Sequence, residues 1–351
     1  MDAVILPPLP QTVWDTIVQL IFEPVLELKD ALIQVQSLSL VSQSLRRACK
    51  NAVLRLDAHR SLDAHVAALA KLPIAVEYLD LDDFYNREYV LRSATFIEHS
   101  ALTLKQVSAA VRCTNTLEKY PLLHTLTLHG QESFPKLYSA VFSNLKNLKI
   151  LELRNYDHDL LTEEVPLDVL TKLETLTVRP RPNGKQYWLH GHEFPLKLKR
   201  LRLDGSLDSL QAVDFVPYPK YRLHDILAAA EEVVIESRSF SMTHSHGTDR
   251  EYDNQSPIFP TTEMYLQWIA RELLSAPVTL KCVEFRLLGL EGLIVGGHSL
   301  NATFFGHLAL PELVDVLEEL APRGRLGDVH WSYNVETRSI FEVYCLRVWR
   351  N

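Results

Sequence analysis

Basic side chains recur at a fixed interval in the middle of the chain. The equally spaced positions 129, 154, 179 and 204 hold His129, Arg154, Arg179 and Asp204, and Arg200 and Arg202 precede the last of them. A guanidinium group presents a planar fork of N–H donors that matches a carboxylate or a phosphate. One hypothesis is therefore that His129, Arg154, Arg179, Arg200 and Arg202 bind an acidic or phosphorylated segment of a target protein. The alternative is an ordinary solvated sheet face, on which residues such as Glu152 pair with arginines across strands.

Motifs for other chemistry are missing from the sequence. It contains no phosphate-binding glycine loop, no nucleophile elbow and no H-E-x-x-H zinc motif. Two H-x-H pairs, His190/His192 and His244/His246, supply two ligands each, but a structural zinc site needs four and no cysteine is near. We therefore expect no metal, no cofactor and no catalytic residues, which predicts a protein that is not an enzyme.

The four cysteines are far apart and form no C-x-x-C pair; they are Cys49, Cys113, Cys282 and Cys345. Thiols spaced in this way are typical of small apolar core residues in a reducing compartment.

The elements that would position the basic residues are short apolar motifs of the form L-x-x-L-x-L. Their members are Leu123-Leu126-Leu128, Leu148-Leu151-Leu153, Leu173-Leu176-Val178 and Leu198-Leu201-Leu203. Side chains alternate between the two faces of a strand, so the apolar residues point into the core and the residues between them point outward. A period of about 25 residues is typical of leucine-rich repeats. The spacing predicts an α/β solenoid with a curved parallel sheet and a helical or irregular convex side, and such surfaces usually bind proteins.

The regular rhythm weakens on both sides of these four motifs. An earlier strand is predicted over 76–81, and the interval 82–122 fits either one long repeat or two short ones, with a helix near 104–113. The interval 206–279 has room for two intermediate repeats with insertions, or for one. It contains a strand near 233–235 and a polar loop near 240–262, followed by a helix over 263–274.

The C-terminal segment, 311–351, is predicted to cap the last repeat. A helix is expected over 311–320 and strands near 328–333 and 340–348, joined by a hairpin connection at 334–339. A hairpin there would cover an exposed sheet edge, which otherwise attracts further strands.

The segment 1–60 shows a different, helical pattern. Pro10 favours a helix start, and the apolar residues that follow have helical spacing until Pro24 ends the helix. The members of this stripe are Val13, Trp14, Ile17, Leu20 and Ile21. Further helices are predicted over 30–36 and 38–54. So few short helices bury little core of their own, and such a unit usually packs against a partner.

This segment resembles an F-box. The resemblance rests on Leu9-Pro10, on Val13-Trp14 with Ile17 and Ile21, and on the stretch from Leu38 to Arg47, LSLVSQSLRR. Together with the downstream repeats, the chain resembles F-box/leucine-rich-repeat proteins, especially fungal-type members with degenerate repeats. One departure is the segment 22–31, which is longer than the usual link between the first two helices.

The resemblance implies a domain division at about residue 60, with an F-box-like domain over 1–60 and degenerate repeats over 61–351. It also implies a non-catalytic substrate-recognition subunit of an SCF-type ubiquitin ligase. The residues implied to contact a Skp1-like adaptor, and through it the cullin ligase complex, are Leu9, Pro10, Ile17, Leu40 and Val41. Two alternatives remain open. The same apolar residues could only pack the helices onto the first repeat, and the protein could be a leucine-rich scaffold or inhibitor without a role in ubiquitination.

The net charge and the hydropathy of the chain argue against some classes of binding partner. The net charge of −8 and the pI near 6.0 argue against a nucleic-acid-binding protein. The sequence has no long apolar run for a membrane span, and an acidic residue stands where a signal peptide carries positive charge. These features predict a cytoplasmic or nuclear protein that binds an unidentified protein substrate, and neither nucleic acid nor membrane.

Overall fold

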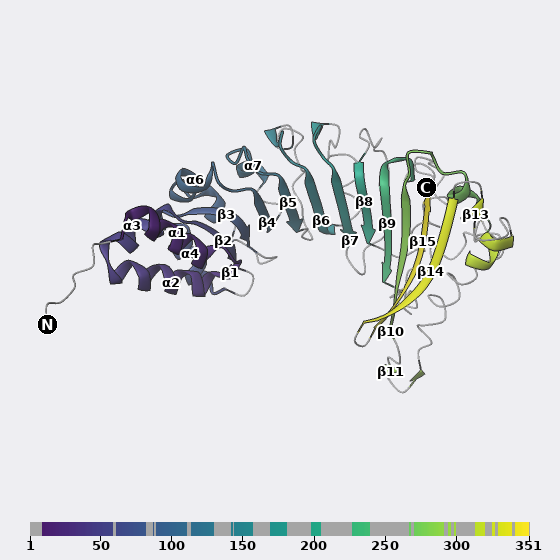
Figure 1. The fold of residues 1–351 in the computed structure, drawn as a ribbon, viewed down its shortest axis with the longest axis horizontal. Coiled ribbons are helices and arrows are strands. Elements are labelled where there is room, and N and C mark those ends of the chain that lie inside the picture. Colours follow the sequence, from purple (N-terminus) through teal and green to yellow (C-terminus); the bar gives the residue numbers. More distant parts are fainter. Residues whose placement is uncertain are drawn as a thin grey trace, which may run out of the picture. The chain divides into compact units, whose positions relative to one another are not determined.

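The computed structural model has a mixed α/β fold with a mostly parallel sheet (Figure 1). It describes residues 9–58, 61–81, 87, 89–110, 114–129, 142, 144–156, 169–180, 198–204, 227–238, 267, 270–290, 294–295, 298–299, 313–319, 325–326, 329–338 and 341–350. The chain forms two compact units, Met1–Leu151 and Glu152–Asn351. A boundary between an F-box-like domain and repeats near residue 60 stays a prediction.

The first unit begins with three helices, α1 (Gln11–Phe22), α2 (Leu28–Val41) and α3 (Gln43–Asn51). Pro10 directly precedes α1, as the sequence predicts. The single helix expected over 38–54 is wrong, because the chain breaks at Ser42. This residue has an extended backbone, and its Oγ accepts a hydrogen bond from the Leu45 amide at 3.1 Å, which caps α3.

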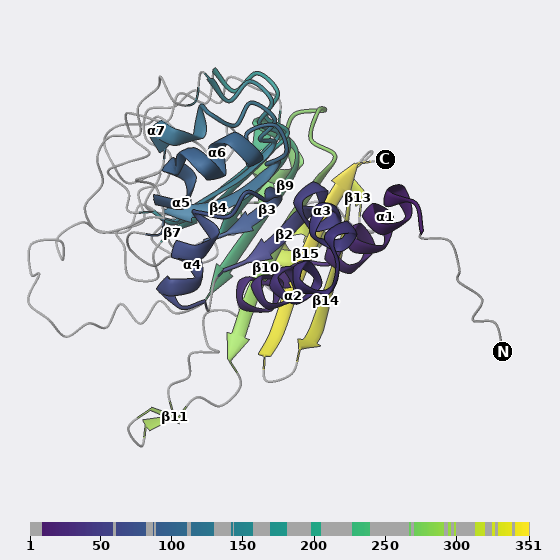
Figure 2. The ribbon, with the colours of Figure 1, turned by 90° about the vertical axis from the view of Figure 1, so that its left-hand side faces the viewer.

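The strands of the first unit lie in the order of the sequence and pair in parallel. They are β1 (Leu26–Glu27), β2 (Val53–Asp57), β3 (Ala75–Asp80), β4 (Gln106–Ala110) and β5 (Thr125–His129). Short helices connect them: α4 (Asp63–Leu69), α5 (Tyr89–Arg92), α6 (Ala94–Ser100) and α7 (Thr114–Leu117). Figure 2 shows α4 to α7 together on one side of the first strands.

Strand β4 lies where the sequence predicted a helix. Val107 and Ala109 alternate with polar neighbours and are buried, and β4 pairs with β3 and β5 on its two sides. Strand pairing has therefore overridden the helical spacing of the apolar residues. The described part of the interval after β3 therefore contains one additional strand, which favours two short units over one long one. Thr103, just before β4, donates a hydrogen bond through its Oγ1 to the Val76 carbonyl at 2.9 Å.

The long segment between the first two helices contributes an edge strand. Leu26 and Glu27 form β1, which pairs in parallel with Leu56 and Asp57 of β2. The sequence did not predict β1 or β2. The extra residues of this segment cover part of an edge that β2 would otherwise expose.

The second unit continues with long strands: β6 (Ile150–Tyr156), which begins at the end of the first unit, then β7 (Thr175–Pro180), β8 (Leu198–Asp204), β9 (Ala230–Arg238) and β10 (Cys282–Leu290). Strands β7 to β10 pair in parallel in the order of the sequence. The predicted apolar residues of the four regular motifs are all buried, which confirms this part of the pattern. Between the motifs at Leu198 and Leu280, the described residues form one strand, β9, at the predicted 233–235.

A hairpin continues the sheet after β10. Strand β15 (Phe341–Arg350) pairs antiparallel with β10, and β14 (Val329–Arg338) pairs antiparallel with β15. A short strand, β13 (Arg325–Leu326), follows β14 in the sheet, while β11 (Ile294–Val295) and β12 (His298–Ser299) form a separate pair. The predicted hairpin is confirmed, but its connection is shorter than expected because 334–338 belong to β14.

Two of the predicted helices are confirmed in part, since 270–274 and 313–319 are helical. The polar loop predicted near 240–262 lies outside the described residues.

Candidate functional site

Helix α1 presents two apolar faces, of which one is buried. Val18 and Phe22 are fully buried and anchor the helix in the first unit. The other face, with residues at i, i+4, i+7 and i+8, is exposed to solvent: Val13, Ile17, Leu20 and Ile21. Apolar side chains beyond those that hold the helix in place are thus left in contact with water.

Polar contacts fix the orientation of α1. The side-chain amide of Gln19 accepts a hydrogen bond from the Val53 N–H at 3.0 Å and donates one to the Val53 carbonyl at 3.2 Å. At the start of the helix, Gln11 Nε2 donates to the Ser44 carbonyl at 3.0 Å. The first turn of α1 therefore lies next to the corner between α2 and α3, just beyond Val41.

All five predicted adaptor contacts are exposed to solvent. Leu40 and Val41, at the end of α2, are each 73% exposed, and Leu9, Pro10 and Ile17 are also exposed. Sequence reasoning put Val13, Leu20 and Ile21 on the apolar stripe of α1 without separating them from the buried residues. We call Leu9, Val13, Ile17, Leu20, Ile21, Leu40 and Val41 the apolar helix surface.

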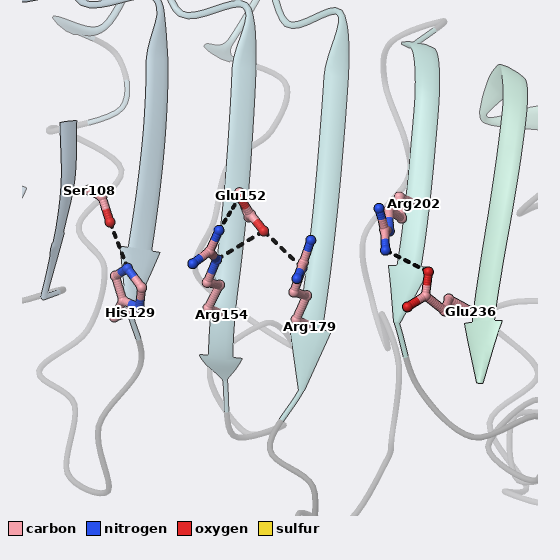
Figure 3. A network of polar contacts seen from close by, with 7 residues as sticks. All are labelled: Ser108, His129, Glu152, Arg154, Arg179, Arg202 and Glu236. Carbon is pink, nitrogen blue, oxygen red and sulfur yellow. Dashed lines mark hydrogen bonds and ion pairs between the residues drawn. The ribbon is translucent and has the colours of Figure 1, made fainter. Parts of the chain in front are cut away.

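The predicted basic residues lie on a sheet face, where most of them are paired. Figure 3 shows these contacts. In the first unit, His129 is only 5% exposed, and its Nε2 lies 2.7 Å from Oγ of the buried Ser108. The structure therefore corrects one part of the prediction: the His129 ring is not part of an exposed binding surface, because strand packing encloses it.

In the second unit, Glu152 joins two arginines. Arg154 donates through Nε and one terminal nitrogen to the two carboxylate oxygens of Glu152, at 3.0 and 3.1 Å. Arg179, on the neighbouring strand, lies 2.8 Å from Glu152 Oε1 through its Nε. The carboxylate is only 17% exposed, so water screens these contacts less than those of an open surface pair.

Further along the same sheet, glutamates partner the other arginines. Arg202 contacts Glu236 at 2.6 Å across β8 and β9, and Arg200 lies 4.0 Å from Glu232. On β10, Arg286 donates twice to Glu284, which raises the pKa of the Arg286 guanidinium above its usual value. The face therefore carries a mixed pattern of charge. The Glu152–Arg179 and Arg202–Glu236 contacts are the cross-strand pairing that the sequence left open, and Arg154 and Arg286 pair with glutamates of their own strands.

The described cysteines and possible metal ligands do not indicate a reactive thiol or a metal site. Of the cysteines in the described part of the chain, Cys49 and Cys345 are buried, as predicted, whereas Cys282 is half-buried. Burial raises the pKa of the Cys49 thiol, which opposes formation of a reactive thiolate. The described residues include no cluster of histidine, cysteine or acidic side chains that could hold a metal ion, and both H-x-H pairs lie outside them.

Among the described helices, none combines the length and the apolar character needed to cross a bilayer. No protein-family model and no curated protein matches the sequence.

Proposed function

We propose that the protein is the substrate-recognition subunit of an SCF-type ubiquitin ligase. Its apolar helix surface binds a Skp1-like adaptor, and its parallel strands carry the face that captures the protein to be modified. The observation that supports this proposal is the exposure of Leu40 and Val41, together with that of the outer face of α1. The protein itself performs no catalysis in this role.

The free energy of burying apolar surface supports a partner at this place. Removing apolar area from water is worth about 25 cal/mol per Å², so a group of exposed leucine, isoleucine and valine side chains is a strong driving force for association. The exposed residues of α1 are neighbours on one face of the helix, and exposed apolar residues grouped in this way are typical of binding sites. Val18 and Phe22 are fully buried, whereas Leu20 is 63% exposed, so the outer face of α1 keeps apolar area that a partner can cover.

The repeated strands support the second half of the proposal. From β6 to β8, each strand buries the apolar residues of its motif and presents charged residues on the other face. Solenoids of this construction commonly use the outer face of their strands for protein binding. We propose that target capture involves Arg154, Arg179, Arg200 and Arg202 within this charged sheet face.

The proposal is tested by co-expression of the full chain with a Skp1-like adaptor. We expect the two proteins to co-purify, and Leu40→Asp to lower the affinity by about 30-fold or more, which is the loss typical of a central interface residue. Leu102, in the turn after α6, is also 73% exposed and makes Leu102→Asp a matched control. The control should bind the adaptor like the unmodified chain.

Two results would contradict the proposal. One is a folded full-length chain that does not bind the adaptor, and the other is equal weakening by Leu40→Asp and Leu102→Asp. Circular dichroism of each variant separates loss of binding from loss of folding.

A further inference from the structure

A cavity in the second unit lies where the parallel strands meet the C-terminal hairpin. Its volume is about 340 Å³, within the range of pockets that hold small ligands or a few side chains. Its lining comes from β9, β10, β14 and β15 and from the residue just before β10. Among the lining residues are Glu232, Lys281, Cys282, Arg347, Trp349 and Arg350. We call this cavity the Arg347 pocket.

Arg347 has a different kind of partner from Arg154, Arg179, Arg202 and Arg286, each of which contacts a glutamate. It stands opposite Glu284 in the register of β10 and β15, but Glu284 already bonds Arg286. The Arg347 Nε instead donates to the Cys282 Sγ at 3.2 Å, a contact that raises the pKa of the Arg347 guanidinium. The side chain is exposed, and the thiol sulfur is a weak acceptor that does not neutralise its positive charge.

The other walls of the pocket are also held in position. The Trp349 indole stacks on His330, with ring centroids 5.8 Å apart and an angle of 19° between the planes. The Arg350 side chain donates through a terminal nitrogen to the Ala276 carbonyl at 2.7 Å, and the backbone N–H of Arg350 donates to the Lys281 carbonyl at 3.1 Å. Lys281 in turn bonds Glu231 through its ammonium group. A preorganised pocket of this kind loses little freedom when it binds.

We propose that the Arg347 pocket binds an acidic segment of the target protein, with an aspartate or glutamate carboxylate on Arg347 and a neighbouring apolar side chain against Trp349. The inference rests on the proposed function, because it names the kind of target segment that the receptor recognises. Within the described part of the chain, three cationic residues and one carboxylate, Glu232, line the cavity, so its charge favours an anion. Glu232 would repel a doubly charged phosphate more strongly than a single carboxylate.

The test measures binding of the full chain to a library of short peptides with blocked ends. We expect enrichment of peptides with aspartate or glutamate next to a large apolar residue. For these peptides, Arg347→Ala should weaken binding by about tenfold, because a hydrogen bond to a charged group is lost. Arg271→Ala, at an exposed arginine outside the pocket lining, is the control and should leave binding unchanged. Glu232→Gln should strengthen binding, a gain that a misfolded variant cannot produce.

The inference is overturned if asparagine and glutamine versions bind equally well, or if Arg347→Ala has no effect. It is also overturned if these blocked, unphosphorylated peptides do not bind and matched peptides with a free C-terminal carboxylate or with a phosphate group bind instead. Adaptor co-purification is measured on the same samples. Failure of the unmodified chain to bind acidic peptides while it still binds the adaptor disproves this inference alone, whereas failure of the unmodified chain to bind the adaptor disproves the proposed function.

Discussion

The apolar helix surface of the first unit and the charged sheet face of the second unit differ in whether their side chains already have partners within the fold. Leu40, Val41 and the outer face of α1 hold apolar side chains in contact with water. On the sheet face, Arg154, Arg179 and Arg202 already bond glutamates within the fold. The first region gains free energy from any partner that covers it, whereas the second gains only if a ligand improves on contacts that exist.

This difference separates two kinds of recognition. Apolar burial is non-directional and scales with area, which suits a constant partner such as an adaptor. A face of paired charges contributes little net affinity, but unmatched charges on a ligand cost several kcal/mol there, which suits discrimination among targets.

The two faces of α1 should respond differently to truncation. Phe22 is fully buried, so Phe22→Ala should lower the free energy of unfolding by about 3–5 kcal/mol through lost burial and a cavity. Ile21→Ala, at the adjacent exposed position, should cost less than about 1 kcal/mol. Urea unfolding of the full chain measures both, and similar losses would show that the outer face packs against the fold.

The Glu152 carboxylate, which two arginines contact, should contribute more to the free energy of unfolding than an exposed carboxylate does. Glu152→Gln removes the charge that two arginines contact, and we expect a loss of about 1–3 kcal/mol in unfolding free energy. Glu174, whose contact with Lys199 is exposed, provides the comparison: Glu174→Gln should cost about 1 kcal/mol or less. Equal effects in the same urea assay would argue that Glu152 is as well screened as a surface residue.

Raising the salt concentration should affect the affinity for an acidic peptide and the affinity for the adaptor differently. The Debye length falls from about 10 Å at 0.1 M to about 3 Å at 1 M ionic strength, so capture of an acidic peptide should weaken markedly. Adaptor binding through apolar side chains should change little over the same range. Isothermal titration at both salt concentrations is the measurement, and a strongly salt-dependent adaptor complex would contradict the apolar interface.

The smallest effect concerns an exposed ion pair at the start of β10. A hydrogen bond from Lys281 lowers the pKa of Glu231 below its ordinary value of 4.5. The pair therefore contributes stability above the unfolded-state pKa, and this contribution disappears as the pH falls from about 4.5 through the lower folded-state value. Glu231→Gln should flatten the pH dependence of unfolding in this acidic window. An unchanged curve would mean that the pair does not contribute.

The regular strands could be predicted from the sequence, whereas the pairing of charges stayed open until the strands were placed side by side. The even spacing of the leucine motifs located β5 to β8, because every repeat must bury the same positions. The prediction failed at β4, where Val107 and Ala109 fit both a helix and a strand until their neighbours on the sheet are known. The Arg347 pocket was also missed, because the antiparallel register alone brings Arg347 beside Cys282, 65 positions apart.

The parallel pairing of β1 with β2 has a mechanical consequence. The residues that link α1 to α2 belong to the same sheet as the strands β2 to β5, and Gln19 bonds α1 to Val53 at the start of β2. Through the described residues 9–58, the apolar helix surface is thus joined to these strands by sheet pairing and hydrogen bonds, without a flexible tether. An adaptor bound to this surface would therefore fix the orientation of strands β2 to β5 as well. The orientation of the first unit within a ligase would then be determined by the fold and not by the length of a linker.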